Sequence, residues 1–122
     1  MATDYALFAA ITYFAAFGVA FLIRPALVGS FGLQWADDAG RAEVRCYYGA
    51  VSVALAAFLT YLRAQDLTVE ALTGVTFLAG AVFVVRVITA TIDRSWSAPY
   101  NRLALPVEAL FVFGLVVTLA FG

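Results

Sequence analysis

The sequence contains no lysine and no histidine, and charged residues make up only 12% of its 122 positions. A soluble domain carries about 25% charged residues, so this chain lacks the composition of a water-exposed surface. Without histidine, it also lacks the usual proton carrier at neutral pH and the commonest metal ligand. Its single cysteine, Cys46, has no partner for an internal disulfide. We therefore expect no metal site and no cofactor, and the net charge of −1 gives no reason to expect a nucleic-acid partner.

Apolar residues fill the chain instead, at 65% of the positions and a mean hydropathy of +0.97. A helix needs about 20 apolar residues to cross the hydrocarbon core of a bilayer. Four runs approach that length: residues 5–23, 46–62, 71–92 and 103–121. The sequence therefore predicts an all-α integral membrane protein, a four-helix transmembrane bundle that forms a single domain over residues 1–122. The start, "MATDYALF", has no basic segment, which indicates a retained helix rather than a cleaved signal peptide.

The links between the four runs differ in length. The second and third links are short, which predicts antiparallel neighbours for the helices that they join. The first link is longer, but its apolar part is too short to span and contains one proline and two glycines. We interpret residues 25–40 as an interfacial segment with Trp35 at the level of the lipid headgroups. Asp37 or Asp38 is expected to cap the second helix.

The arginines are distributed unevenly between the two faces of the membrane. One face and its adjoining helix ends hold six of them: Arg24, Arg41, Arg45, Arg86, Arg94 and Arg102. The other face holds only Arg63. Because arginine-rich loops stay in the cytoplasm, this asymmetry predicts that both termini point outward, to the periplasm in a Gram-negative bacterium. Aromatic side chains near the span ends are expected to be interfacial anchors: Tyr5, Trp35, Tyr61, Trp96 and Tyr100.

Arg86 stands out because it lies inside the apolar run "LAGAVFVVRVITATI". An arginine at the centre of a membrane helix costs about 2.5–3.5 kcal/mol on insertion scales, so this side chain needs a partner. Arg86 precedes Ile92 by six residues, and Glu108 follows Arg102 by six. At about 1.5 Å per residue, both lie roughly 9 Å from the same end of two antiparallel helices. The spacing therefore predicts an ion pair between Arg86 and Glu108.

The second helix adds Glu43 and Arg45 at the same end of the protein. Two positions correspond to about 200° around a helix, so these two charges point to opposite sides and must meet different neighbours. We expect a polar cluster of six residues: Glu43, Arg45, Tyr47, Tyr48, Arg86 and Glu108. A stripe of small residues on the second helix is expected to let another backbone come close: Gly49, Ser52 and Ala56.

Three stretches carry a resemblance to a known family: "GRAEVRCYYGA", "VVRVITATID" and "LPVEALF". They resemble a family of small bacterial four-helix membrane proteins that is catalogued as domain of unknown function 4345. The match covers nearly the whole chain and is carried by six residues: Glu43, Arg45, Tyr48, Gly49, Arg86 and Glu108. Ala50 departs from the pattern, which has a second glycine there. The resemblance implies a four-helix inner-membrane protein and no established activity.

Several functions stay open at this point. The ionic cluster can be structural, can bind a polar-headed amphiphile, or can conduct protons. The first hypothesis is a non-catalytic protein, either an accessory subunit of a membrane complex or a binder of a lipid-like ligand. The alternative is a small membrane enzyme or carrier that acts on an anionic or quinone-like amphiphile. Partners beyond the bilayer are a membrane protein, a second copy of this chain or the amphiphile. We expect three phenylalanines of the first helix to face lipid rather than a ligand: Phe14, Phe17 and Phe21.

Overall fold

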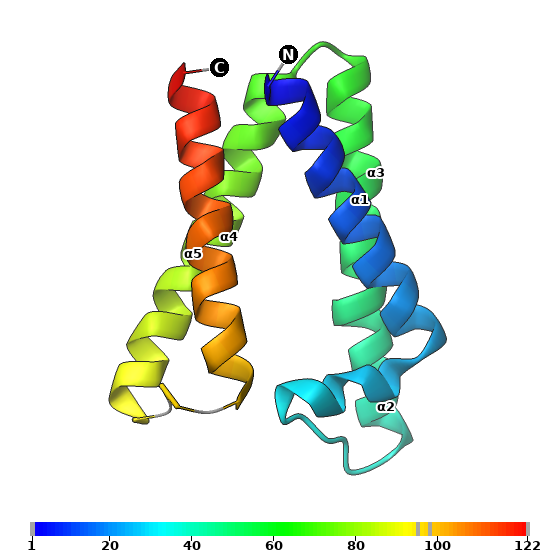
Figure 1. Ribbon diagram of the computed structural model, residues 1–122. Coiled ribbons are helices and arrows are strands. Elements are labelled where there is room, and N and C mark those ends of the chain that lie inside the picture. The colour runs from blue at the N-terminus through cyan, green and yellow to red at the C-terminus, as the bar shows by residue number, and fades with distance from the viewer. Residues whose placement is uncertain (1, 95, 98, 122) are drawn as a thin grey trace. The chain divides into compact units, whose positions relative to one another are not determined.

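The computed structural model describes residues 2–94, 96–97 and 99–121 and is all-α (Figure 1). Four helical stretches in these ranges are long and apolar enough to cross a membrane: Ala2–Ile23, Asp38–Ala64, Thr68–Ile92 and Tyr100–Phe121. The shortest have 22 residues, which gives about 33 Å of helix against a hydrocarbon core of about 30 Å. The predicted all-α membrane fold is therefore confirmed, and each helix begins earlier than its apolar run. Ser95 and Ala98 of the predicted third link lie outside the described residues.

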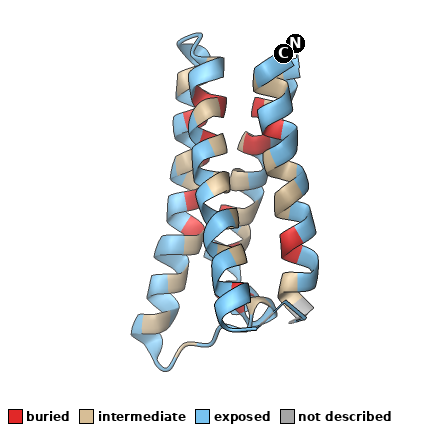
Figure 2. Ribbon diagram, turned by 90° about the vertical axis from the view of Figure 1, so that its left-hand side faces the viewer, coloured by how far each residue is buried: buried red, intermediate tan, exposed pale blue. Residues whose placement is uncertain are grey.

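Exposed and half-buried residues make up most of each helix (Figure 2), and many of the exposed ones are large and apolar. Large side chains such as Phe77, Leu110 and Phe113 are more than two-thirds exposed. A soluble monomer rarely exposes continuous apolar surface on this scale. The protein is therefore a small multi-span membrane protein whose exposed helix faces contact lipid.

The residues cluster into two compact units, which we describe separately. The amino-terminal unit is Leu7–Leu67, and the carboxyl-terminal unit consists of the described parts of Met1–Ala6 and Thr68–Gly122. In the amino-terminal unit, α1 (Ala2–Ile23) packs closely against the second span, at the junction of η2 (Arg45–Ala50) and α3 (Val51–Ala64) (Figure 1). A Cβ atom on Gly18 would lie 2.8 Å from the carbonyl oxygen of Gly49 and 2.8 Å from the backbone nitrogen of Val53. This crossing therefore requires glycine at position 18.

The segment of the amino-terminal unit that follows α1 folds back onto this helix. It contains the 3-10 helix η1 (Pro25–Phe31), which ends at Gly32 with a φ of 79°. Phe31 at the end of η1 stacks on Phe17 and Tyr48, with ring centroids 6.4 and 6.0 Å away. Phe21 joins this cluster and is only 4% exposed, so the expectation that it faces lipid is wrong. The physical reason is that η1 and Tyr48 cover the side of α1 that carries Phe21.

The second span consists of three consecutive helical segments. The α-helix α2 (Asp38–Val44) is followed by the π-helix η2 (Arg45–Ala50) and by α3 (Val51–Ala64). The side chain of Asp37 accepts a hydrogen bond from the Gly40 amide, which confirms it as the N-cap. The predicted small-residue stripe is buried: Gly49, Ser52 and Ala56.

The carboxyl-terminal unit is a hairpin of α4 (Thr68–Ile92) and α5 (Pro99–Phe121) (Figure 1). The buried residues of the hairpin include two alanines, Ala90 of α4 and Ala104 of α5. Arg86 lies four residues before Ala90, and Glu108 lies four residues after Ala104. Since residues four apart share a helix face, both charges are carried on the packed sides of their helices.

Candidate functional site

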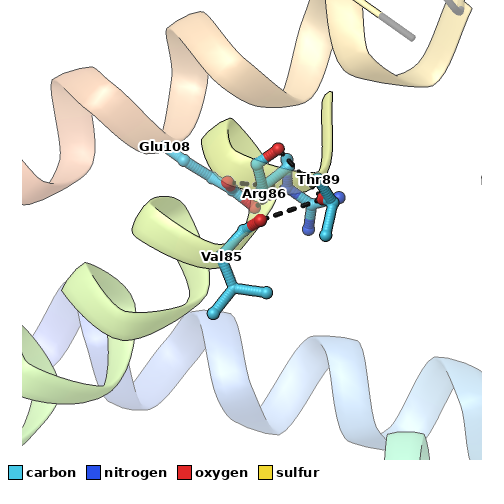
Figure 3. A network of polar contacts seen from close by, with 4 residues as sticks. All are labelled: Val85, Arg86, Thr89 and Glu108. Atoms are coloured by element: carbon cyan, nitrogen blue, oxygen red, sulfur yellow. Dashed lines mark hydrogen bonds and ion pairs between the residues drawn. The ribbon is translucent and has the colours of Figure 1, made fainter. Parts of the chain in front are cut away.

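The two charged residues within the α4–α5 hairpin form a direct ion pair. The Nε atom of Arg86 donates to both carboxylate oxygens of Glu108, at 2.8 and 3.0 Å (Figure 3). The side chains of Arg86 and Glu108 are 25% and 24% exposed, respectively. The pair predicted from equal depth is therefore present. It answers why an apolar run tolerates this arginine, because each charge supplies the counter-ion of the other.

Tyr100 is a further neighbour of the guanidinium group. The Cζ atom of Arg86 lies 5.1 Å from the centroid of the Tyr100 ring. This distance falls within the range of a cation–π contact, which strengthens where water is excluded. Tyr100 is in the first turn of α5, and Glu108 lies two turns further along the helix. The guanidinium group is thus fixed by an acidic side chain from within the span and by an aromatic ring from near its end.

Threonine hydroxyls in α4 form hydrogen bonds to backbone carbonyls of their own helix. Thr73, Thr76 and Thr91 each donate to the carbonyl four residues earlier. Thr89 donates to the carbonyl oxygens of Val85 and Arg86, at 2.9 and 3.1 Å (Figure 3). A hydroxyl whose single proton is used in this way keeps its oxygen lone pairs as acceptors. While these bonds are made, Thr89 offers its oxygen as a hydrogen-bond acceptor.

An open groove of about 430 Å³ lies beside the ion pair in the carboxyl-terminal unit. Its lining contains an apolar part and a polar part: Ala81, Val82 and Val85, and then Arg86, Thr89 and Asn101. Along α4 the apolar residues come first and the polar ones lie toward the end of the span. The groove therefore changes from apolar to polar in the direction of the membrane surface.

The other residues of the predicted polar cluster belong to the amino-terminal unit. Arg45 donates through Nε to the carbonyl oxygen of Leu22 at 3.2 Å. Tyr48 is a member of the ring cluster with Phe17, and Tyr47 is exposed. Glu43 is exposed and has no hydrogen-bond or ion-pair partner within the described part of the chain. The structure thus brings Arg86 and Glu108 together, whereas Arg45 binds a backbone carbonyl rather than a carboxylate.

Sequence reasoning missed three residues of the groove and its surroundings. Tyr100 was expected only as an interfacial anchor, and Thr89 and Asn101 were not assigned to a site. Asn101 precedes Glu108 by seven residues, a spacing that places both on one face of a helix. That spacing was a usable signal for Asn101. No comparable signal exists for Tyr100, because its contact depends on the direction in which the Arg86 side chain extends.

Comparison with known proteins adds no assignment: no protein-family model, curated protein or solved structure matches this chain. The function must therefore be inferred from the geometry of the groove itself.

Proposed function

We propose that this protein is a non-catalytic membrane protein that binds a polar-headed amphiphile in the groove of the α4–α5 hairpin. The observation that carries the proposal is the order of the groove lining, with apolar Val82 and Val85 followed by polar Thr89 and Asn101. From Ala81 to Thr89 the groove follows about 12 Å of helix at 1.5 Å per residue. A lipid-like molecule has the same order, with an apolar chain followed by a polar head group.

The ion pair alone supports a structural role as well as a binding role. Intramembrane ionisable residues usually mark a ligand or ion pathway, yet they must pair to be tolerated. Arg86 is both paired to Glu108 and part of the groove lining. This double placement favours binding, because an ion pair that served only to join two helices would not need to line a groove.

The proposed location is a bacterial inner membrane, with both termini in the periplasm. The support is the six-to-one distribution of arginine between the two faces. Alkaline phosphatase fused to the carboxyl terminus should be active, and green fluorescent protein fused there should be dark. The opposite pattern would reverse the proposed orientation.

We also propose membership of the family catalogued as domain of unknown function 4345. The pairing of Arg86 with Glu108 and the burial of Gly49 support it, since these residues carry the resemblance. An alignment of homologous sequences tests the proposal. Positions 86 and 108 should then change together, and independent variation at the two positions would count against it.

A second candidate function, an accessory subunit of a membrane complex, has one observation in its favour. Gly74, Gly80 and Gly114 lie on α4 and α5 with no described atom within 4 Å of an added Cβ. Small residues let membrane helices approach closely, so these open positions suit a partner helix or a second copy of the chain. Native mass spectrometry of protein extracted gently from its own membrane distinguishes the two. A retained protein partner supports the subunit, and a retained small molecule supports the binder.

The chain offers a matched pair of variants that tests the groove directly. Val82 lines the groove and is 45% exposed, whereas Val84 lies on the same helix, is 53% exposed and does not line it. Val82→Trp should fill the groove and abolish retention of the small molecule. Val84→Trp should leave retention unchanged. Equal retention by the two variants would show that the molecule binds elsewhere and would contradict the proposed function.

A further inference from the structure

We propose that the groove selects an uncharged, hydroxylated amphiphile over an anionic one, an inference that rests on the proposed binding function. The head group would have both a hydrogen-bond donor and an acceptor, as in a monoacylglycerol or a long-chain alcohol. Two separate observations carry this selection: the charge balance of the groove and the hydrogen-bonding state of Thr89.

The charge balance comes from the ion pair. Arg86 is the only charged residue that lines the groove among the described residues, and Glu108 neutralises it through both carboxylate oxygens. Beyond the groove, Asp93, Arg94 and Arg102 are exposed at the same end of the hairpin. Asp93 and Arg94 carry opposite charges, and charges exposed to water interact through a high dielectric constant, so these three side chains act on the groove more weakly than Arg86 and Glu108 do. An anionic head therefore meets a site of nearly zero net charge.

An anion can reach the full charge of Arg86 only by displacing Glu108. Displacement would leave the Glu108 carboxylate without its counter-ion inside a membrane span. Removing one partner of a buried ion pair is strongly unfavourable, because the remaining charge stays desolvated. A neutral oxygen avoids this cost, since it can accept a hydrogen bond from a guanidinium group that remains paired. The terminal nitrogens of Arg86 lie on the side of the guanidinium group away from Glu108 (Figure 3).

The second observation is the state of the Thr89 hydroxyl. Its proton is used in bonds to the carbonyl oxygens of Val85 and Arg86, so in this arrangement its oxygen is offered to a ligand as an acceptor. A hydroxyl head can donate to Thr89 while it accepts from Arg86 or from the Asn101 amide. An ionised carboxylate has no proton to donate, so it can bond to Thr89 only if the hydroxyl gives up its bonds to the carbonyls of Val85 and Arg86. The groove lining thus matches a hydroxyl better than it matches an anion.

The test compares two probes that have the same acyl chain, 1-monooleoylglycerol and oleate. Each is added at equal concentration to the purified full-length protein in a nonionic detergent, and native mass spectrometry measures the bound fraction. The wild-type protein should bind monooleoylglycerol at least about tenfold more tightly than oleate, which corresponds to about 1.4 kcal/mol. Glu108→Gln should reverse the preference, because position 108 then no longer neutralises the charge of Arg86. Thr89→Val should weaken monooleoylglycerol binding and leave oleate binding unchanged. If Glu108→Gln does not fold, Thr89→Val is the variant that tests the selection.

The outcomes separate this inference from the proposed function. Equal binding of the two probes, or tighter binding of oleate by the wild-type protein, would overturn the selection and leave the groove as a binding site. Binding of both probes that is unaffected by Val82→Trp would overturn the proposed function itself.

Discussion

The two units of the protein each use one arginine through its Nε atom, but they give it different partners. Arg45 donates to the carbonyl oxygen of Leu22, near the end of α1. Arg86 donates to the carboxylate of Glu108. A helix C-terminus carries about half a negative charge, which suffices for an exposed arginine such as Arg45. Arg86 is only 25% exposed, and an arginine that is partly buried within a span requires a full counter-ion. The exposure of each arginine therefore matches the kind of partner that it has.

The units also differ in how their helices are held together. In the amino-terminal unit, the backbones of Gly18 and Gly49 come into direct contact, and rings from three elements stack beside them. In the carboxyl-terminal unit, Gly80 and Gly114 lie on open faces, and an ion pair joins the helices. Close backbone packing and ring stacking thus stabilise the amino-terminal unit, whereas an ion pair stabilises the carboxyl-terminal unit. The predictions below test this contrast.

The largest effect is expected from Arg86→Glu, which places two carboxylates together on the packed faces of α4 and α5. By analogy with broken buried ion pairs, the free energy of unfolding should fall by about 3–5 kcal/mol. The measurement is unfolding in mixed detergent micelles titrated with a denaturing detergent. The double variant Arg86→Glu with Glu108→Arg should recover most of the loss. Arg94→Glu, at an exposed position beyond α4, is the control and should have little effect. If Arg86→Glu were as stable as the wild-type protein, the ion pair with Glu108 would not stabilise the carboxyl-terminal unit.

The next effect is expected from Gly18→Ala, which tests shape in the amino-terminal unit. The added methyl group would lie 2.7–2.8 Å from atoms of Gly49 and Val53, two of which belong to the backbone. Overpacking of this kind costs about 1–3 kcal/mol. Gly80→Ala is the matched control because it meets open space in α4, and it should raise helix stability by up to about 1 kcal/mol. The same unfolding titration measures both, and a loss of similar size in the two variants would remove the contrast.

The sequence was sufficient for those features that depend on local composition or on depth. Apolar length predicted the four spans, and the equal distance of Arg86 and Glu108 from their helix ends predicted the ion pair. The cap at Asp37 followed from the preference of an aspartate side chain for free amides at a helix start. Each of these features depends on residues that are close in sequence or on the thickness of the bilayer.

The features that the sequence did not predict depend on contacts between distant segments. Phe21 was expected to face lipid, but Phe31 and Tyr48 cover it from outside its own helix. The π-helix at residues 45–50 also had no recognised signal, and it occurs where Arg45 and Gly49 both contact Leu22. A helical wheel drawn for one segment cannot show what another segment places on its surface.

A smaller effect is expected from Phe31→Ala, which removes the ring that joins η1 to α1. Aromatic pairs contribute about 0.5–1.5 kcal/mol beyond their buried area, and Phe31 stacks on Phe17 and Tyr48. We expect a loss of about 1–2 kcal/mol, together with faster hydrogen exchange across residues 25–37. Leu27→Ala, at an exposed position of the same 3-10 helix, is the control. Unchanged exchange in Phe31→Ala would show that the ring cluster does not hold the interfacial segment.

The smallest effect is expected at Arg45, and it sharpens the comparison between the two arginines. Arg45→Met keeps the apolar stem and removes the charge, so the Leu22 carbonyl loses its donor. A cation at a helix C-terminus contributes about 0.3–1 kcal/mol at low ionic strength, and salt should reduce that loss further. Arg86→Met should cost several times more and should respond less to salt, because Glu108 is left unpaired inside the span. Equal losses in the two methionine variants would mean that exposure does not determine how much each arginine contributes.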